Sequence, residues 1–136
     1  MGQQQLLLII LGVIIVAIAI AIGIAFFNAQ LISSNKDGII EHLNTIATHA
    51  FTYAMRPLIL GGGDGSFEGY QIPTGYASNI HGTYSLVVNA SRSRKNKQKR
   101  GALTIEGVSS KGYGTVKMAI DDSASVLKIS YTGQFK

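Results

Sequence analysis

One uninterrupted apolar run dominates the start of the chain. Residues 6–27 read LLLIILGVIIVAIAIAIGIAFF, which is 22 positions without a charged or strongly polar side chain. As an α-helix rising 1.5 Å per residue, this run spans about 33 Å, which matches the hydrocarbon thickness of a bilayer. A single segment in lipid can satisfy its backbone hydrogen bonds only as a helix. The pattern therefore predicts an apolar helix suited to a membrane or to the interior of a polymer.

Other interpretations begin from the same residues. A cleaved secretory signal would be shorter and would follow a basic segment; Ala19-Ile20-Ala21 could serve as its cleavage site, but the apolar run continues to Phe27 and residues 1–5 carry no charged side chain. The Met-Gly start is weak evidence for myristoylation, because Leu6 stands where that motif has Ser or Thr. A plain single-pass anchor remains open.

The helical pattern continues beyond the apolar run and becomes one-sided. Residues 28–56 contain no proline. Apolar residues at helical spacing are Ile32, Ile39, Leu43, Ile46, Ala50 and Ala54, whereas Lys36, Asp37, Glu41, Asn44, Thr45 and Thr48 occupy the other side. Pro57 and the glycines of residues 61–65 should end the helix near Arg56. We therefore expect one helix from about Gln3 to Met55.

Downstream of residue 82 the pattern changes to a period of two, which is typical of strands with one buried face. Apolar and polar residues alternate in four stretches, within Thr83–Ser91, Leu103–Glu106, Val116–Ile120 and Leu127–Tyr131. Turn-like residues, Ser109–Gly112 and Asp121–Ser123, separate the last three. The pattern predicts an antiparallel meander whose apolar face covers the helix over residues 39–54.

These elements predict an α+β fold, in which a long N-terminal helix packs on a C-terminal antiparallel sheet of about four strands. The chain then has four regions. They are the apolar helix 1–27, its amphipathic continuation 28–56, a connector 57–82 rich in Gly and Tyr, and the sheet 83–136, which forms one globular head with 28–56.

The net charge of +5 comes from one segment. Six basic residues fall within nine positions, namely Arg92, Arg94, Lys95, Lys97, Lys99 and Arg100. Such a segment could bind the phosphates of DNA, acidic polysaccharide or lipid headgroups. The plainer interpretation is a solvated hairpin tip that discourages aggregation of sheet edges, which the lack of interleaved aromatic residues favours.

The chain offers no constellation typical of an active site, so we expect no enzymatic activity, cofactor or metal. It has no cysteine. His42 and His49 lie seven apart on one helix face, without an HExxH pattern or an obvious acidic partner. Gly61–Gly65 follows a helix and lacks a GK[ST] ending, which indicates a flexible connector rather than a phosphate loop. Asp121 and Asp122 are interpreted as turn residues.

Two surface features complete the sequence. Asn89-Ala90-Ser91 is a formal N-glycosylation sequon, although such tripeptides also arise by chance. Tyrosines such as Tyr70, Tyr76, Tyr84 and Tyr113 should pack the sheet and connector, or could form a stripe between neighbouring subunits.

A short leader ending in glycine, an apolar helix with an amphipathic second half and a small antiparallel sheet together resemble the type IV pilins and pseudopilins. In that family a peptidase cleaves after a glycine just before the apolar run, which places the processing site at Gly2 and Gln3 and the mature start at QQQLLLIILG. The Gly-Gln junction is also similar to that of some archaeal pilin-like precursors.

The resemblance implies a structural subunit of a pilus-like extracellular filament, held as a single-pass protein of the cytoplasmic membrane before assembly. Its implied partners are other copies of itself, the membrane, the pilus assembly machinery and the prepilin peptidase. The filament would serve adhesion, motility or secretion, and DNA or acidic polysaccharide could bind the basic segment. The helix residues implied in bundling are Leu6, Leu7, Leu8, Ile9, Ile10, Leu11, Gly12, Val13, Ile14, Ile15, Val16, Gly23, Phe26 and Phe27.

The chain departs from the family pattern in its first half. Leu7 stands where the family usually carries a glutamate, and the first acidic residue is Asp37. The family's helix-breaking proline is missing, with Gly23 near its place; Gly12 and Gly23 allow close helix approach or local unwinding. The alternative function is a non-polymerising, membrane-anchored binding module that uses residues 92–100 on DNA or polyanions.

Overall fold

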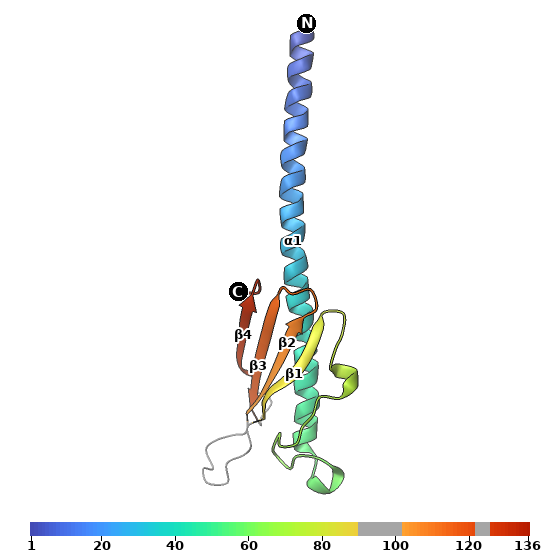
Figure 1. Cartoon of the computed structure of the whole chain (residues 1–136), viewed down its shortest axis with the longest axis vertical. Helices are drawn as coiled ribbons and strands as arrows, with labels where there is room; N and C mark the ends of the chain where they lie inside the picture. The colour runs from blue at the N-terminus through green and yellow to red at the C-terminus, as the bar shows by residue number, and fades with distance from the viewer. Residues whose placement is uncertain (90–101, 122–125) are drawn as a thin grey trace. The chain divides into compact units, whose positions relative to one another are not determined.

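A computed structural model of the chain describes residues 1–89, 102–121 and 126–136 (Figure 1). A long helix is followed by two short 3-10 turns and four strands. The elements are α1 (Gly2–Met55), η1 (Leu58–Leu60), η2 (Thr74–Tyr76), β1 (Gly82–Asn89), β2 (Ala102–Ser109), β3 (Gly114–Asp121) and β4 (Val126–Gly133). The predicted α+β fold is confirmed.

The chain divides into two compact units, Met1–Ser33 and Ser34–Lys136. The first unit is the start of α1 alone. The second unit contains the rest of α1, the connector and the sheet, and we refer to it as the head. The head therefore holds every strand that the structure describes.

Helix α1 ends at Met55, as the proline and glycines after it predict. The glycine segment then folds back and caps the helix: the backbone N–H of Gly63 donates to the carbonyl of Tyr53 (3.0 Å), and that of Gly65 donates to the carbonyl of Ala54 (2.7 Å). Gly65 has a φ of 83°, a left-handed conformation that favours glycine. The segment predicted as a flexible connector thus also satisfies carbonyls that the helix end leaves free.

The four strands form one antiparallel sheet in the order β1-β2-β3-β4, which is the predicted meander. Two irregularities interrupt the pairing, between Leu86 and Val88 and between Ala119 and Ile120, and the alternation had not predicted them. Asp121 is a correction: it is the last residue of β3, pairs with Ala102 and is buried, so it is not a turn residue.

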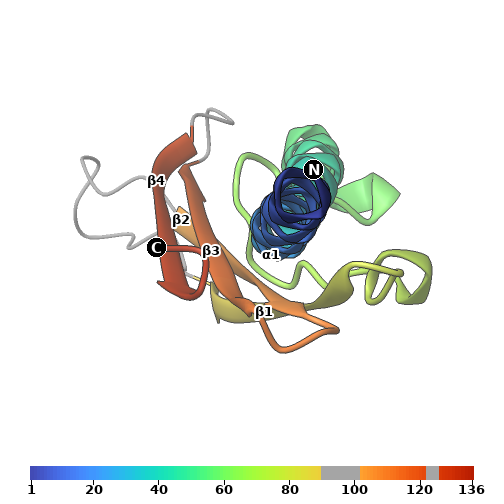
Figure 2. The ribbon, with the colours of Figure 1, turned by 90° about the horizontal axis from the view of Figure 1, so that it is seen from above.

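Within the head, α1 lies against one face of the sheet (Figure 2). The core forms between this face and one side of the helix, which supplies Ile39, Leu43, Ile46, Ala50 and Ala54. The sheet supplies Tyr84, Leu103, Ile105, Val116, Met118 and Ile120. Ile32, predicted on this side, is only half-buried.

A glycine allows the helix to approach the sheet closely. Gly107 lies in β2 between Tyr84 and Val116 on the neighbouring strands. A Cβ atom at Gly107 would lie 2.7 Å from Cγ2 of Ile39 and 3.1 Å from the ring of Tyr84. A larger residue at this position would therefore force the Ile39 side chain or the Tyr84 ring to shift.

Candidate assembly surface

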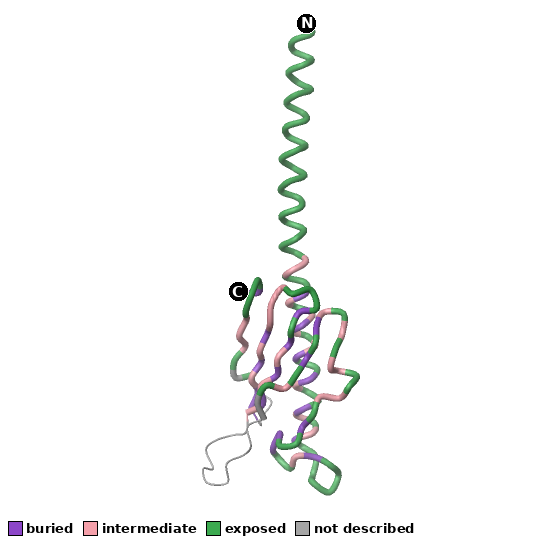
Figure 3. Tube along the Cα trace, in the orientation of Figure 1, coloured by how far each residue is buried: buried purple, intermediate pink, exposed green. Residues whose placement is uncertain are grey.

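Residues 6–27 of α1 are exposed on every side, as Figure 3 shows for the first part of the chain. The exposed fraction of the large apolar side chains ranges from 49% at Ile14 to 72% at Phe26. By length and composition, α1 is the one helix in the described part of the chain that could cross a membrane. A membrane anchor and a signal sequence share this character.

The residues predicted for assembly all lie on this exposed helix. At Gly12 and Gly23 an added Cβ would meet nothing within 4 Å, and the helix continues through both positions. Among the described residues, therefore, no contact within the chain requires glycine at either site. The predicted processing residues, Gly2 and Gln3, form the exposed start of α1.

The predicted polyanion and glycosylation sites fall largely outside the described residues. Residues 90–101 lie between the end of β1 and the start of β2, so the basic residues Arg92 to Arg100 have no structural description. Asn89 is the last residue of β1 and its backbone pairs with Leu103, while its side chain is not described. Asp122 also lies outside the described residues.

A polar network surrounds the point where α1 enters the head, and its centre is Asn35, which is 7% exposed. The side-chain amide of Asn35 donates to the carbonyl of His81 (3.1 Å), and its oxygen accepts from the hydroxyl of Ser109 (2.7 Å). The ammonium of Lys36 donates to the carbonyl of Phe135 (3.2 Å) and lies 4.1 Å from the centre of the Tyr131 ring. Two consecutive helix residues thus hold three separate segments of the head.

These segments form a continuous surface that we call the Asn35 collar, which consists of residues 34–37, 79–82, 109–114 and 133–136. The segments also bond to each other. The backbone N–H of Ser110 donates to the carbonyl of His81 (2.9 Å), and that of Gln134 donates to the carbonyl of Tyr113 (2.7 Å). Figure 1 shows the turn after β2 and the end of β4 at the same end of the sheet.

The two helix histidines hold the connector through tyrosines. One ring nitrogen of His42 lies 3.1 Å from the carbonyl oxygen of Tyr76, and one of His49 lies 3.1 Å from the hydroxyl of Tyr70. The His42 ring is also 4.3 Å from that of Tyr84, and both histidine rings contact Tyr76. These residues share one helix face as predicted, and tyrosines of the connector and β1 contact both rings, although His49 remains exposed.

Two of the tyrosines that contact these histidines, Tyr70 and Tyr84, have raised pKa values. Burial, together with the nearby Tyr76, raises the pKa of Tyr70 to about 12. Burial also raises the pKa of Tyr84, against the opposing hydrogen bond with Asn79. Among the described residues no group of three His, Cys, Asp or Glu side chains is arranged to hold a metal ion.

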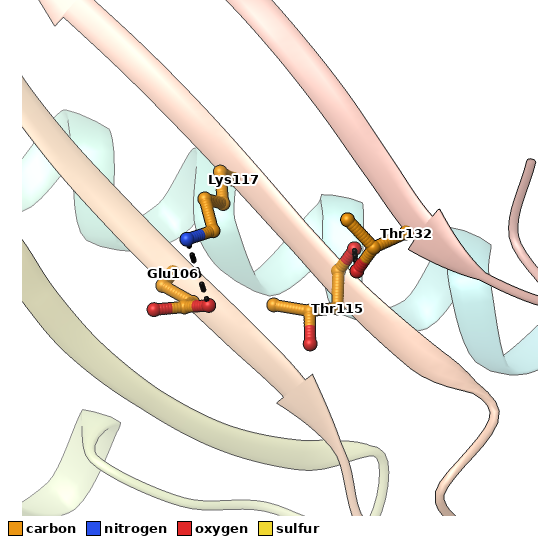
Figure 4. A network of polar contacts seen from close by, with 4 residues as sticks. All are labelled: Glu106, Thr115, Lys117 and Thr132. Carbon is orange, nitrogen blue, oxygen red and sulfur yellow. Dashed lines mark hydrogen bonds and ion pairs between the residues drawn. The ribbon is translucent and has the colours of Figure 1, made fainter.

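The outward face of the sheet is mostly polar. On neighbouring strands, Nζ of Lys117 lies 3.3 Å from an Oε atom of Glu106, and the hydroxyl of Thr132 donates to the carbonyl of Thr115 (3.3 Å), as drawn in Figure 4. An exposed cross-strand ion pair of this kind contributes about 0.2–1 kcal/mol. This face suits contact with water.

Comparison of the chain with known protein families, characterised proteins and solved structures finds no match. What the structure itself shows is a pilin-like architecture: a long helix with an apolar first part, whose second part packs on a four-stranded antiparallel sheet.

Proposed function

We propose that this chain is a type IV pilin-like protein, the structural subunit of an extracellular filament whose interior is a bundle of apolar helices. The observation that carries the proposal is the contrast between the chain's apolar surfaces. Residues 39–54 of α1 are covered by the chain's own sheet, whereas residues 6–27 are covered by nothing. A partner outside the chain must therefore cover them.

The hydrophobic effect decides what can cover this segment. Apolar surface left in water costs about 25 cal/mol per Å², and exposed apolar patches larger than a few hundred Å² are rare on soluble monomers. Lipid can cover a single helix, and copies of the same helix can cover one another. The subunit would wait in the cytoplasmic membrane as a single-pass protein and then exchange lipid for protein contact as it enters the fibre.

The head fits the outer layer of such a fibre. It closes its own core, and no buried side-chain nitrogen or oxygen among the described residues lacks a hydrogen-bond partner. These buried polar atoms therefore need no neighbouring subunit as a hydrogen-bond partner. Filaments covered by such heads would carry out adhesion, motility or secretion at the cell surface, and the assembly machinery would supply the energy for extraction.

Processing would expose a new amino group at Gln3. The prepilin peptidase would cut between Gly2 and Gln3 before assembly. Intact mass of the native protein measures this directly, because loss of Met1 and Gly2 gives one defined decrease. A mass that retains both residues in mature filaments would contradict the proposed processing while leaving assembly itself untouched.

Electron microscopy of purified surface material tests the filament directly. The expected result is uniform filaments that contain this chain and disappear when its gene is deleted. A detergent-soluble monomer with no filaments would contradict the proposal and favour the second candidate.

The second candidate is a membrane-anchored binding module, favoured by the six basic residues between β1 and β2. It predicts retention of the detergent-solubilised chain on DNA-cellulose at low salt and release at high salt. Replacing Lys95, Lys97 and Lys99 with Gln should then flatten the salt dependence. Unchanged binding of that variant would reject a role for these lysines in phosphate contacts.

A further inference from the structure

The Asn35 collar presents an exposed isoleucine on a firmly bonded turn. Ile80 is 83% exposed, although it lies between residues that the head holds tightly. The side-chain oxygen of Asn79 accepts hydrogen bonds from the backbone of His81 (2.9 Å) and Gly82 (3.0 Å). The hydroxyl of Ser110 donates to the carbonyl of Ile80 itself (3.0 Å). The turn therefore holds an apolar side chain out toward the surroundings, and no rearrangement of the head is needed to present it.

The charges of the collar have one predominant sign. Its four segments carry three lysines, Lys36, Lys111 and Lys136, against one aspartate, Asp37. Lys111 follows Ser110 in the turn bonded to Ile80, and both Lys111 and Lys136 are exposed. Tyr113, half-buried, lies in the same turn. Apolar, tyrosyl and lysyl side chains on one surface are the combination found where proteins meet the interface of a membrane.

The length of chain between the apolar run and the collar limits how far the two can separate. Eight residue steps lead from Phe27 to Asn35. As helix they span about 12 Å, and even fully extended they span no more than about 29 Å. The headgroup layer adds roughly 5–8 Å on each side of the hydrocarbon core. With residues 6–27 in a bilayer, the length of this linker alone keeps Asn35 within about 12 Å (helical) to 29 Å (extended) of the hydrocarbon core, so side chains of the collar can reach the headgroup layer.

We propose that the Asn35 collar docks on anionic lipid headgroups while the subunit waits in the membrane. Ile80 enters the interface, and Lys111, Lys136 and Lys36 face the negative charges. This inference rests on the membrane stage of the proposed function and adds a second point of contact to it. Docking would fix the orientation of the head before assembly, and the contact would be released when the subunit is extracted.

Tryptophan fluorescence can test this contact, because the chain contains no tryptophan. The full chain carrying Ile80→Trp is reconstituted in vesicles of phosphatidylcholine, alone or mixed equally with phosphatidylglycerol. Lipids brominated near the headgroup end of the acyl chain serve as the quencher. Ile59→Trp is the matched control, because Ile59 is 96% exposed in η1, just beyond the other end of the head's helix. Phe27→Trp reports on the anchor itself.

The proposal predicts a blue-shifted emission and severalfold stronger quenching for Ile80→Trp than for Ile59→Trp, at low salt and with phosphatidylglycerol present. Adding Lys111→Gln to the Ile80→Trp chain should lower the ratio of docked to free heads about fivefold, the contribution of one lysine near an anionic surface. High salt should also lower the ratio of docked to free heads, because it screens the attraction between the lysines and the anionic lipids.

Three results would overturn the proposal. If Ile80→Trp is quenched no more than Ile59→Trp while Phe27→Trp is quenched strongly, the collar does not dock but the anchor stands. If Phe27→Trp is not quenched either, the membrane stage of the proposed function fails as well. A blue shift that grows with the ratio of protein to lipid and ignores lipid charge would assign the collar to a second copy of the chain.

Discussion

The two parts of α1 differ in where their partners come from. Residues 6–27 are exposed on every side, whereas residues 35–54 bury one stripe against the sheet and expose the other. The second part is stabilised within the chain by burial of Ile39, Leu43 and Ile46. The first part has no such contact, and under the proposed function it depends on lipid or on other copies. If the proposed function holds, one continuous helix serves folding in its second part and assembly in its first, and we expect a substitution to damage either property alone.

We expect the largest effect on stability when the same substitution, leucine to alanine, is made separately in each part of α1 and the two variants are compared. Leu43→Ala removes a side chain with no exposed surface, so the free energy of unfolding of the head should fall by about 2–5 kcal/mol. Leu11→Ala, at a position that is 50% exposed, should change it by no more than about 0.5 kcal/mol. Denaturant unfolding of the full chain in detergent, followed by tyrosine fluorescence, measures both. Equal losses would mean that the two parts of the helix are stabilised alike.

A charged residue in the exposed part of α1 should impair membrane insertion and assembly but leave the stability of the head unchanged. Ile15→Asp places a carboxylate near the middle of the apolar run, where membrane insertion of an aspartate costs about 2.5–3.5 kcal/mol, whereas that of an isoleucine is favourable. Filament yield and the membrane-bound fraction should both fall, while unfolding of the head stays unchanged. Ile15→Leu is the control and should behave as the parent chain. Normal filaments from Ile15→Asp would contradict the bundled core.

Asn35 marks the boundary between the two parts and should have a smaller effect. Asn35→Ala leaves the buried Ser109 hydroxyl without its acceptor and removes one of the donors to the His81 carbonyl, which should cost about 1–3 kcal/mol of head stability. Asn44→Ala, at an exposed position of the same helix, should cost less than about 0.5 kcal/mol. If the two variants unfold at the same denaturant concentration, the network around Asn35 contributes nothing to stability.

Alkaline pH should weaken only the part that contains the tyrosine cluster. The pKa of Tyr70 is about 12 in the folded head and near 10 in the unfolded chain, so between these values the folded state binds more protons. The free energy of unfolding should therefore fall as pH rises from 10 to 12, whereas Tyr70 makes it no steeper or shallower with pH near neutrality. Tyr70→Phe should make that fall less steep. An unchanged slope in Tyr70→Phe would exclude the tyrosine as its cause.

Repeating patterns made much of the fold predictable. Pro57 and the glycines after it located the end of α1 at Met55, and alternation located four strands in the right order. Both features depend on neighbours in sequence, which is why they could be recognised. The strand irregularities near Leu86 and Ala119 left no such pattern.

The polar contacts of the head were not predicted, since they join residues far apart in sequence. Asn35 and Ser109 are 74 positions apart, and Lys36 and Phe135 are 99 apart. The sequence did contain one indication that Asn35 is buried and hydrogen-bonded. Asn35 lies four residues before Ile39 and so continues the buried stripe of the helix, where a polar residue needs a partner. The apolar helix was predicted from the sequence. Which molecules cover it in the cell cannot be predicted in this way, because that depends on molecules other than this chain.

Helical reconstruction of purified filaments by cryo-electron microscopy tests the central claim most directly. The account predicts a core in which residues 6–27 of neighbouring copies contact one another, surrounded by heads whose outward sheet faces meet water. Filaments whose interior is built from heads, with residues 6–27 absent or facing solvent, would contradict it.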